Sequence, residues 1–589
     1  MPAPTWLLVI LTLIAAGLAC AAPVRARIYR AARRLRRMTP RQRAIATAAV
    51  FVIAAAYLSF TALWQGRPLY PKYHDSQSYA IQAQIIASGR LWLPPHPMAD
   101  FFDTFHVIVT PAYCSMYFPG TAMAFAVGVL AGAPFWIIAA LISAGCVALL
   151  FSVIAEIVDG WAGAVAAVWL LSLMWFRYVS VIVMSQPLML LLGLAMFCAY
   201  LRWRRERRIG WAMLIGAFAG FAAVTRPADA LAYALPLGAA ILYDCFRRPL
   251  REFLTTAGAI VAAAAPWLVL QVIFNLGVTG EAFHSPYRLY LDRDAPQFSF
   301  GFHKSDLTKL PRSPIVQKTE YHVRYNRPMI LAHRPERLLD AWLNPRTGRL
   351  MDVLAATLPS PVPLDTLTPT AIALIPLLFA GLFGLTTVPR RALAAVFPLY
   401  CFFYLFYAAL LRHYTPVVAP ATILLAMLGM RQVESLWPRR RAAVATFAAV
   451  MVVGQCILAL PEMNPNVRDD PFEYVELIDA REIIPTSVQQ PALVLVKFTP
   501  RPDENVHGEP VYNWEAAKID DNPIIFAHDL GERNIELIRY YAQRRPARRV
   551  YYFDRVDRKL KSAGTVAAEL ERLETLQPQQ LPPPTTAPE

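Results

Sequence analysis

Residues 134–155 read PFWIIAALISAGCVALLFSVIA, a run of 22 residues without a charged side chain. A helix rises about 1.5 Å per residue, so this run is long enough to cross the roughly 30 Å hydrocarbon core of a bilayer. Similar runs recur along the chain, and the sequence therefore predicts an α-helical polytopic membrane protein with about twelve transmembrane helices. The predicted spans lie near residues 5–22, 44–64, 134–157, 161–183, 185–201, 210–225, 229–246, 253–276, 367–387, 392–411, 414–430 and 442–460.

The composition of the 589-residue chain supports this class: 56% of the residues are hydrophobic, 17% are charged, and the mean hydropathy is +0.38. These values exclude an ordinary soluble enzyme. The net charge of +16 raises the question of nucleic acid, but the basic excess lies in short clusters between apolar runs. Residues 461–589 carry 16 basic and 22 acidic side chains. We therefore expect no nucleic-acid partner.

Seven scattered cysteines, most of them inside apolar runs, indicate neither a disulfide framework nor a cysteine-type metal site.

The orientation of the spans follows from the basic clusters. Nine arginines lie between Arg25 and Arg43, directly after the first apolar run, which we interpret as an anchor with its N-terminus outside. Basic residues collect in cytoplasmic loops, so we place this cluster in the cytoplasm. Because successive spans cross the membrane in opposite directions, every later arginine cluster then also falls on the cytoplasmic side. The same alternation requires that the apolar run at 120–132 does not cross, so we expect a short helix at the outer surface there.

Three polar regions then fall outside. The last of them is predicted to be a small α/β domain, with strands at 491–498, 522–530 and 548–555 and a helix at 532–543. The predicted organisation is an N-terminal anchor and basic loop at 1–43, a transmembrane domain at 44–460 with outer loops at 65–133 and 277–366, an extracytoplasmic α/β domain at 461–576, and a disordered Pro-rich tail at 577–589.

A candidate catalytic residue lies in the first outer loop, in YPKYHDSQSYAIQAQIIASGRLWLPP at residues 70–95. Apolar residues follow Asp75 at helical intervals, and an aspartate at this position commonly caps the helix. The same carboxylate, with His74 and Tyr79 beside it, also suits a general base. The motif FFDTFH adds a second acid, Asp103, together with His106. These two side chains suit either a divalent cation or a solvated helix face.

Two arginines lie on the outer side, against the charge rule. Arg226 follows the sixth span, and Arg412 ends the tenth. Arg226 either pairs with Asp229 or belongs to a binding site. Arg412 either extends its guanidinium to the membrane–water interface or belongs to the same binding site. Two outer guanidiniums near a carboxylate suit a lipid-linked phosphate. Further donors to the same anion are Lys72, His413 and Tyr414.

Several motifs resemble the polytopic glycosyltransferases of the GT-C fold, in particular the bacterial branch related to protein mannosyltransferases and the aminoarabinose transferase of lipid A. The resemblance covers roughly residues 44–430. The motifs are DSQSYAIQA at 75–83, GRLWLP at 89–94, FFD at 101–103, YFPG at 117–120, RP at 226–227 and RHYTP at 412–416.

This resemblance implies inverting transfer of a sugar from a polyprenyl-phosphate donor to a glycan, lipid or protein acceptor, on the outer face of the bacterial cytoplasmic (inner) membrane. The family's catalytic carboxylate corresponds to Asp75. The family often has Asp-Glu where this chain has Asp75-Ser76, so either the second carboxylate is dispensable or Asp103 takes its part. The chain contains no GxGxxG or GxxxxGK[ST] pattern, as expected for a donor without a nucleotide.

The long outer loop at 277–366 exceeds the length of a simple connection and is predicted to cap the site. Its aromatic residues either stack on sugar rings or anchor the loop at the headgroup level. They are Tyr287, Tyr290, Phe298, Phe300, Tyr321 and Tyr325.

Two other classes of protein fit part of this pattern. A transporter or flippase of a lipid-linked anion would also need outer arginines and many spans, but it favours polar groups near the bilayer midplane, and the predicted spans are almost uncharged. A non-catalytic subunit with a partner-binding C-terminal domain is the third alternative.

Overall fold

The computed structural model describes residues 3–246, 248–302, 308, 310–344, 348–359, 372–460, 483–499 and 509–576. The predicted tail at 577–589 lies outside the described residues. The same holds for residues 461–482 of the predicted C-terminal domain and for the beginning of the predicted span at 367–387.

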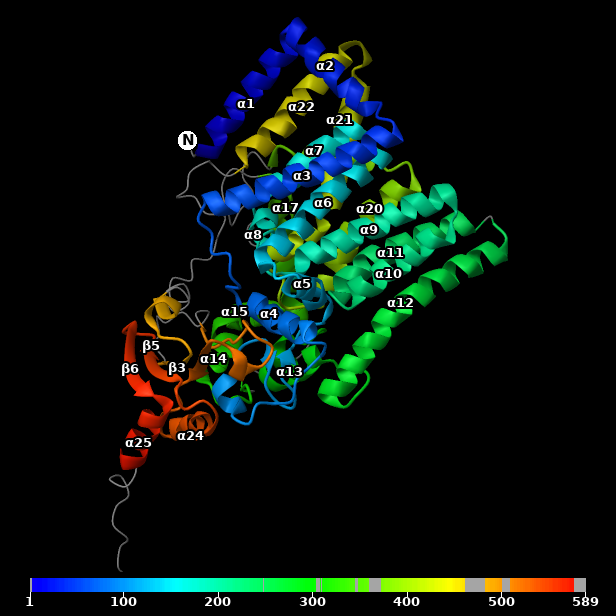
Figure 1. Cartoon of the computed structure of the whole chain (residues 1–589). Coiled ribbons are helices and arrows are strands. Elements are labelled where there is room, and N and C mark those ends of the chain that lie inside the picture. The colour runs from blue at the N-terminus through cyan, green and yellow to red at the C-terminus, as the bar shows by residue number, and fades with distance from the viewer. Residues whose placement is uncertain are drawn as a thin grey trace, which may run out of the picture.

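Helices occupy most of the described part of each predicted span (Figure 1), although the helix of the predicted span at 392–411 ends at Tyr404. Among the described residues, six helical segments are individually long and apolar enough to cross a membrane. The number is seven if α1 and α2, which are bent by 92°, form one span. The chain is therefore an integral membrane protein. The helices are α1 (Ala3–Cys20), α2 (Ala22–Arg36), α3 (Pro40–Trp64), α6 (Phe135–Ile157), α7 (Gly160–Ser172), α8 (Met174–Val179), α9 (Ser185–Glu206), α10 (Ile209–Ala223), α11 (Pro227–Cys245), α12 (Leu250–Thr279), α19 (Ile375–Leu382), α20 (Val388–Tyr404), η5 (Arg412–Val418), α21 (Ala419–Leu436), η6 (Pro438–Arg440) and α22 (Arg441–Leu458).

The predicted span at 161–183 is not one helix, because the chain is extended at Leu173, between α7 and α8. Arg177 of α8 is buried and turns back toward the end of α7. Its guanidinium donates to the carbonyl oxygens of Leu171 at 3.0 Å and Ser172 at 2.6 Å. Carbonyls at a helix end lack intrahelical partners, so this arginine stabilises the break.

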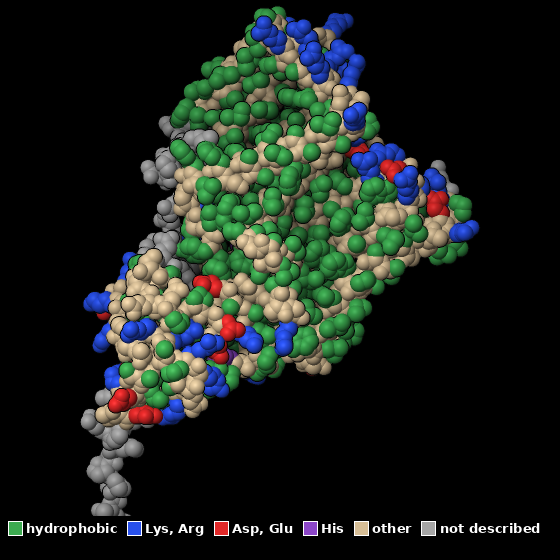
Figure 2. Space-filling model, viewed as in Figure 1, with side chains coloured by type: hydrophobic (Ala, Val, Ile, Leu, Met, Phe, Trp, Pro, Cys, Tyr) green, Lys and Arg blue, Asp and Glu red, His purple; other side chains and the backbone are tan. Residues whose placement is uncertain are grey.

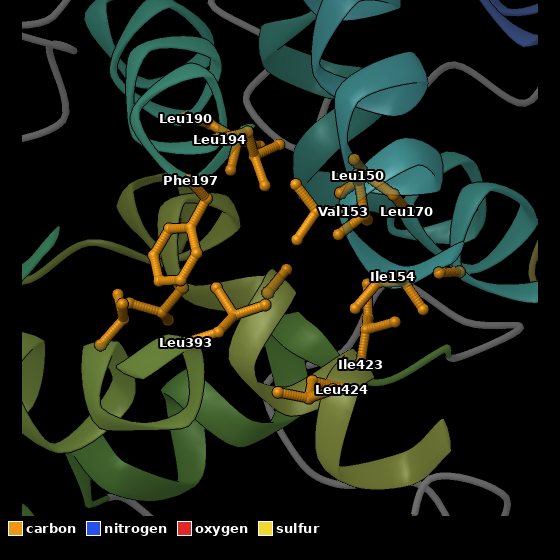
Figure 3. Close-up of a cluster of buried hydrophobic side chains, with 14 of the residues drawn as sticks. Leu150, Val153, Ile154, Leu170, Leu190, Leu194, Phe197, Leu393, Ile423 and Leu424 are labelled. Carbon is orange, nitrogen blue, oxygen red and sulfur yellow. The ribbon is translucent and has the colours of Figure 1, made fainter. Parts of the chain in front are cut away.

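The core of the transmembrane part is formed by side chains from helices in both halves of the chain, and Figure 3 shows part of it. The buried face of α6 contributes residues spaced three and four apart, as expected of a helix packed on one side. Figure 3 labels Leu150, Val153 and Ile154 of α6, Leu170 of α7, Leu190, Leu194 and Phe197 of α9, Leu393 of α20, and Ile423 and Leu424 of α21.

The greater part of the two outer segments forms a layer below the transmembrane helices in Figure 1, whereas α17 (Arg349–Thr357) lies level with those helices. Within this layer α5, the helix at the predicted surface segment, has 11 residues, and at about 1.5 Å per residue it is too short to cross a bilayer. The elements of the first outer segment are α4 (His74–Ala87), η1 (Ala99–Phe102), β1 (Val107–Ile108), β2 (Cys114–Ser115) and α5 (Gly120–Leu130). Those of the long segment are α13 (Pro286–Asp294), η2 (Pro296–Phe298), α14 (Val316–Thr319), η3 (Glu320–Tyr325), α15 (Arg327–Ala332), η4 (Pro335–Arg337), α16 (Leu338–Leu343) and α17 (Arg349–Thr357).

The C-terminal region forms a four-stranded sheet in the order β4-β3-β5-β6. The strands β3 (Ala492–Lys497), β4 (Ile524–His528) and β5 (Arg549–Asp554) lie at the three predicted strand positions and are mutually parallel. Helix α24 (Asn534–Arg544) confirms the predicted helix. The prediction missed β6 (Lys559–Thr565), which pairs antiparallel with β5, and α25 (Val566–Leu576). Strand β6 is a largely polar edge strand, so its sequence contains no hydrophobic run that would predict a strand. The remaining short turns are η7 (Ile519–Asp521) and η8 (Gly531–Arg533).

Charged side chains gather at opposite ends of the molecule (Figure 2). Lysine and arginine cover α2 at one end, and they gather with some acidic residues at the α9–α10 and α11–α12 connections nearby. Charges of both signs cover the C-terminal region at the other end, and the surface between the two ends is mostly hydrophobic. This distribution is that of a protein embedded in a bilayer.

Candidate active site

Helix α4 sets the position of Asp75. The helix begins at His74, and its first turn is closed by Ser76, whose hydroxyl accepts from the backbone N–H of Tyr73 at 2.8 Å. Asp75 is thus the second residue of the helix and not its cap, which corrects one of the two interpretations of its position. Because Ser76 closes the turn, the carboxylate of Asp75 is left to reach other partners.

Those partners are His106 and Tyr117. The Tyr117 hydroxyl donates to Asp75 Oδ1 at 2.6 Å, and His106 Nδ1 lies 2.8 Å from the same oxygen. His106 Nδ1 is also 3.1 Å from the Tyr117 hydroxyl, so the three groups form a closed triangle. Among the described residues, none bonds to the second carboxylate oxygen, Oδ2. That oxygen remains able to accept a proton.

The backbone around His106 is held at several points. His106 has a φ of 61°, in the left-handed region that residues other than glycine rarely adopt. Its N–H donates to the Tyr290 hydroxyl at 3.0 Å, and its carbonyl accepts from Ser78 Oγ at 2.6 Å. Such strained residues often occur at functional sites, where surrounding contacts fix them.

The environment of Asp75 favours the carboxylate. Burial by itself raises the pKa of Asp75, but the hydrogen bond and charge of His106 and the hydrogen bond of Tyr117 together bring it well below its ordinary value. Burial and the nearby charge of Asp75 raise the pKa of Tyr117, so that phenol keeps its proton and remains a donor. The carboxylate is therefore ionised throughout the physiological pH range.

A cavity of about 780 Å³ opens beside Asp75. Most of its described lining is apolar or aromatic, and it includes eleven tyrosines and four histidines. The six aromatic residues singled out in the long outer loop all line it. Arg226 is the one lysine or arginine among the described residues of the wall. The wall thus combines a carboxylate, a guanidinium and a large aromatic surface.

Arg226 is held on three sides. Its Nε donates to Asp229, its Nη1 donates to Ser185 Oγ at 3.0 Å, and its Nη2 donates to the Tyr404 hydroxyl at 2.7 Å. The guanidinium also lies over the Tyr414 ring, 4.7 Å from its centroid. The pairing with Asp229 and a place in the cavity wall, which the sequence presented as alternatives, are both realised.

The structure places the predicted site residues in two groups. Six of them line the cavity: Asp75, His74, Tyr79, Arg226, His413 and Tyr414. Three others, Asp103, Arg412 and Lys72, do not line it.

Asp103 belongs to a buried ionic cluster. Its carboxylate accepts from Lys318 Nζ at 2.7 Å and from Ser313 Oγ at 2.5 Å. Lys318 in turn donates to Asp294 at 2.7 Å. The cluster joins the first outer segment to the long one, so the contacts of Asp103 hold these two segments together.

Arg412 and Lys72 have other surroundings. Arg412 donates through Nε at 3.0 Å and Nη2 at 2.7 Å to Asp352 of α17. Lys72 is buried, and its ammonium lies 5.5 Å from the centroid of the Tyr73 ring. Among the described residues, no group of three or more His, Cys, Asp and Glu side chains could hold a metal ion.

Sequence reasoning missed the roles of Tyr117, Ser185 and Tyr404. Tyr117 lies in the YFPG motif and His106 lies in FFDTFH, so both stood in motifs already noted. Their convergence on Asp75 depends on the backbone turn at His106, for which the sequence carries no glycine signal.

The sequence matches no known protein-family model and no curated protein. Among solved structures, the chain is similar to ArnT from Cupriavidus metallidurans bound to undecaprenyl phosphate, with a TM-score of 0.44 and 14% identity, over 81% of this chain and 85% of that one. It is also similar to the apo oligosaccharyltransferase of Archaeoglobus fulgidus, with a TM-score of 0.40 and 14% identity, over 74% and 58% of the two chains. A third similar structure is the arabinosyltransferase EmbB of Mycobacterium smegmatis, with a TM-score of 0.39 and 17% identity, over 70% and 33%. Each is a similarity of chain fold at low sequence identity.

Proposed function

We propose that the protein is an inverting glycosyltransferase that moves a hexose or pentose from a polyprenyl-phosphate donor to an acceptor on the extracytoplasmic face of the cytoplasmic membrane. The observation that carries this proposal is the pairing, in one aromatic cavity, of an ionised carboxylate with one free oxygen and a guanidinium. The acceptor is a hydroxyl group of a glycan, a lipid or a protein.

Asp75 acts as the general base. Its Oδ2 accepts the proton of the acceptor hydroxyl while that oxygen attacks the anomeric carbon of the donor sugar. His106 and Tyr117 hold Oδ1, so the carboxylate keeps one orientation throughout the reaction. A single displacement of this kind inverts the anomeric configuration.

The leaving group is the lipid phosphate. As the glycosidic C–O bond breaks, the electron pair stays on the phosphate oxygen, and the polyprenyl phosphate departs as an anion. Arg226, with the hydroxyls of Tyr404 and Tyr414 and the imidazole of His413 on the same wall, supplies the positive charge and the donors for this anion.

The lining of the cavity supports a lipid-linked donor. Leu231 of α11 and Phe402 of α20 belong to the cavity wall and are 46% and 49% exposed. These apolar residues suit a polyprenyl chain entering from the bilayer, while the tyrosines of the outer loops suit the sugar.

The distribution of charge supports the sidedness. The arginines of α2 lie at the opposite end of the molecule from the C-terminal region (Figures 1 and 2). With the basic end in the cytoplasm, the C-terminal domain and the outer segments lie on the extracytoplasmic side.

The test is the exchange Asp75→Asn in the full-length protein. Purified protein would be incubated with radiolabelled polyprenyl-phosphate hexoses and pentoses and with cell envelopes from a strain without the protein. Released polyprenyl phosphate and labelled envelope would be measured together. We expect Asp75→Asn to lower transfer by about 10²- to 10⁴-fold, the usual contribution of a general base.

The control is Glu281→Gln, which changes a carboxylate whose side chain is 72% exposed, and it should transfer at the normal rate. Full transfer by well-folded Asp75→Asn would refute the proposed function and would favour a transporter or a non-catalytic subunit.

A further inference from the structure

The C-terminal sheet turns its carboxyl edge toward the first outer segment. In doubly wound sheets this edge, where the order of parallel strands reverses, is the usual place for a ligand. Here β3 lies between β4 and β5, and the last residue of β4, His528, has its Nε2 2.6 Å from the carbonyl oxygen of Asp103. Nearby, Gln317 of α14 donates to Glu509 at 3.2 Å. Outer segments of the same chain thus occupy the position that a ligand takes in such sheets.

Tyr512 extends this contact to the neighbours of the candidate base. Its side chain is buried, and its hydroxyl donates to the carbonyl oxygen of Phe105 at 3.1 Å. His74 Nδ1 lies 2.8 Å from the same hydroxyl oxygen. Since the Tyr512 proton is directed at Phe105, the His74 Nδ1–H is the donor in the second bond.

One hydroxyl group therefore joins two backbone segments. His74 immediately precedes Asp75, and Phe105 immediately precedes His106. The distance between Asp75 and His106 depends on how these segments are held, and His106 has a left-handed backbone that requires support.

The domain that carries Tyr512 is firmly docked. Leu493, Leu495 and Ile538 of the C-terminal domain share one hydrophobic core with Ile81 and Phe101 of the first outer segment. Because the two regions share a core, Tyr512 is fixed relative to α4.

Polar contacts add to this docking at the edge of the shared core. Asp520 accepts from Tyr540 at 2.8 Å and from Tyr541 at 2.7 Å, and it lies 3.0 Å from Nε2 of His96. Arg533 donates to Asp100 at 3.0 Å.

We propose that the C-terminal domain is a positioning domain for catalysis, and that Tyr512 is the positioning residue through which it sets the geometry of Asp75 and His106. This inference rests on the proposed glycosyltransferase function. It assigns the domain a role in the chemical step instead of in holding the acceptor at the carboxyl edge of its sheet.

The test compares Tyr512→Phe with Tyr552→Phe. Both changes remove one hydroxyl from the same domain, and the Tyr552 hydroxyl bonds within the domain, to Glu569 at 2.7 Å. With a polyprenyl-phosphate sugar as donor, we expect Tyr512→Phe to lower kcat about 10- to 100-fold, while the KM for the donor stays within about twofold. The acidic limb of its pH profile should move to higher pH, because Asp75 loses well-placed partners. Tyr552→Phe should behave like the unaltered protein.

A second readout does not depend on turnover. Amide hydrogen exchange within residues 103–107 should accelerate in Tyr512→Phe and stay unchanged in Tyr552→Phe. Unchanged kcat, pH profile and exchange in folded Tyr512→Phe would overturn the positioning role. Full transfer by Asp75→Asn would refute the proposed function instead, and the exchange measurement would still report whether Tyr512 holds the two segments.

If Tyr512→Phe does not fold, His528 provides the same comparison. His528→Gln keeps a donor for the Asp103 carbonyl and should retain kcat, whereas His528→Leu removes it and should lower kcat. Equal kcat values for the two variants would overturn the inference.

Discussion

The imidazole Nδ1 of His106 lies 2.8 Å from Oδ1 of Asp75. An ionised carboxylate can only accept a hydrogen bond, so Nδ1 of His106 carries a proton and donates it to Asp75. Tyr117 donates to the same oxygen, and both partners thereby orient the carboxylate and keep it charged. The proposed base is therefore defined by this arrangement and not by Asp75 alone.

We predict that His106→Ala and Tyr117→Phe each move the acidic limb of the rate profile to higher pH. Burial raises the pKa of Asp75, whereas His106 and Tyr117 lower it, so removing either partner leaves burial to dominate. In the unaltered protein the lowered pKa keeps Asp75 ionised as pH falls through the ordinary carboxyl range. The stability that this ionisation contributes is complete above the ordinary pKa and is lost as pH falls from there through the lowered pKa. The double variant should shift furthest. Rates measured between about pH 4 and pH 8 test this, and superimposable profiles would contradict it.

We predict opposite outcomes for the two outer arginines. Arg226 lines the cavity, so Arg226→Gln should lower kcat/KM about 10²-fold, as expected when a preorganised donor is removed. Arg412 pairs with Asp352 outside the cavity lining. The kcat/KM of Arg412→Gln should therefore stay within about threefold of the normal value, as expected when a partly exposed ion pair is lost. Steady-state kinetics on the polyprenyl-phosphate donor measure both variants.

Loss of Arg226 also leaves Asp229 buried without its cation. The double variant Arg226→Gln with Asp229→Asn separates these effects. If it recovers normal kcat/KM, the role of Arg226 is structural and its assignment to the phosphate is wrong.

The sequence predicted the features that local composition determines. The sequence predicted twelve spans and their orientation, because a bilayer sets the length of each apolar run and the side on which arginine clusters collect. The break at Leu173 was not predicted. Arg177 interrupts the apolar run at 161–183, but its bonds to the carbonyl oxygens of Leu171 and Ser172 exist only in the folded chain.

The sequence predicted only part of the candidate site, again because contacts between distant residues decide the rest. Asp75 stands out as an acid at the start of a surface helix, but Asp103 stood out equally. What separates them is that Lys318, far along the chain, binds Asp103, whereas Asp75 keeps an oxygen free. Which side chain contacts each carboxylate depends on the tertiary structure, so a single sequence does not reveal it.

We predict that Lys318→Met strongly destabilises the protein. Lys318 is fully buried between Asp103 and Asp294. Its removal would leave Asp103 with only the distant cation of Arg293, which bonds to Asp294 at 2.9 Å and lies 4.0 Å from Asp103. Breaking a buried ionic pair typically costs about 3–5 kcal/mol. Unfolding in detergent should show this loss, whereas Lys561→Met, at an exposed position of β6, should change stability by less than about 0.5 kcal/mol. Equal stability of the two variants would show that the cluster does not hold the outer segments together.

Two glycines, Gly381 of α19 and Gly429 of α21, lie where these helices meet. A methyl group on Gly429 would collide with the backbone of Leu377, and one on Gly381 would collide with the backbone of Leu425. Small residues that allow such close approach are a common basis of helix packing in membranes. Each change to alanine should therefore cost about 1–3 kcal/mol. Gly258→Ala in α12, with no atom within 4 Å of the added methyl, should be neutral or stabilising.

The double variant Gly381→Ala with Gly429→Ala should cost less than the sum of the single changes. Once the first methyl has separated the two helices, the second enters space that is already open, so the two sites are coupled. Unfolding of all four proteins, followed by loss of helical signal in increasing denaturing detergent, measures this coupling. Strict additivity would mean that the two glycines act at independent contacts and that the close approach of α19 and α21 does not depend on them jointly.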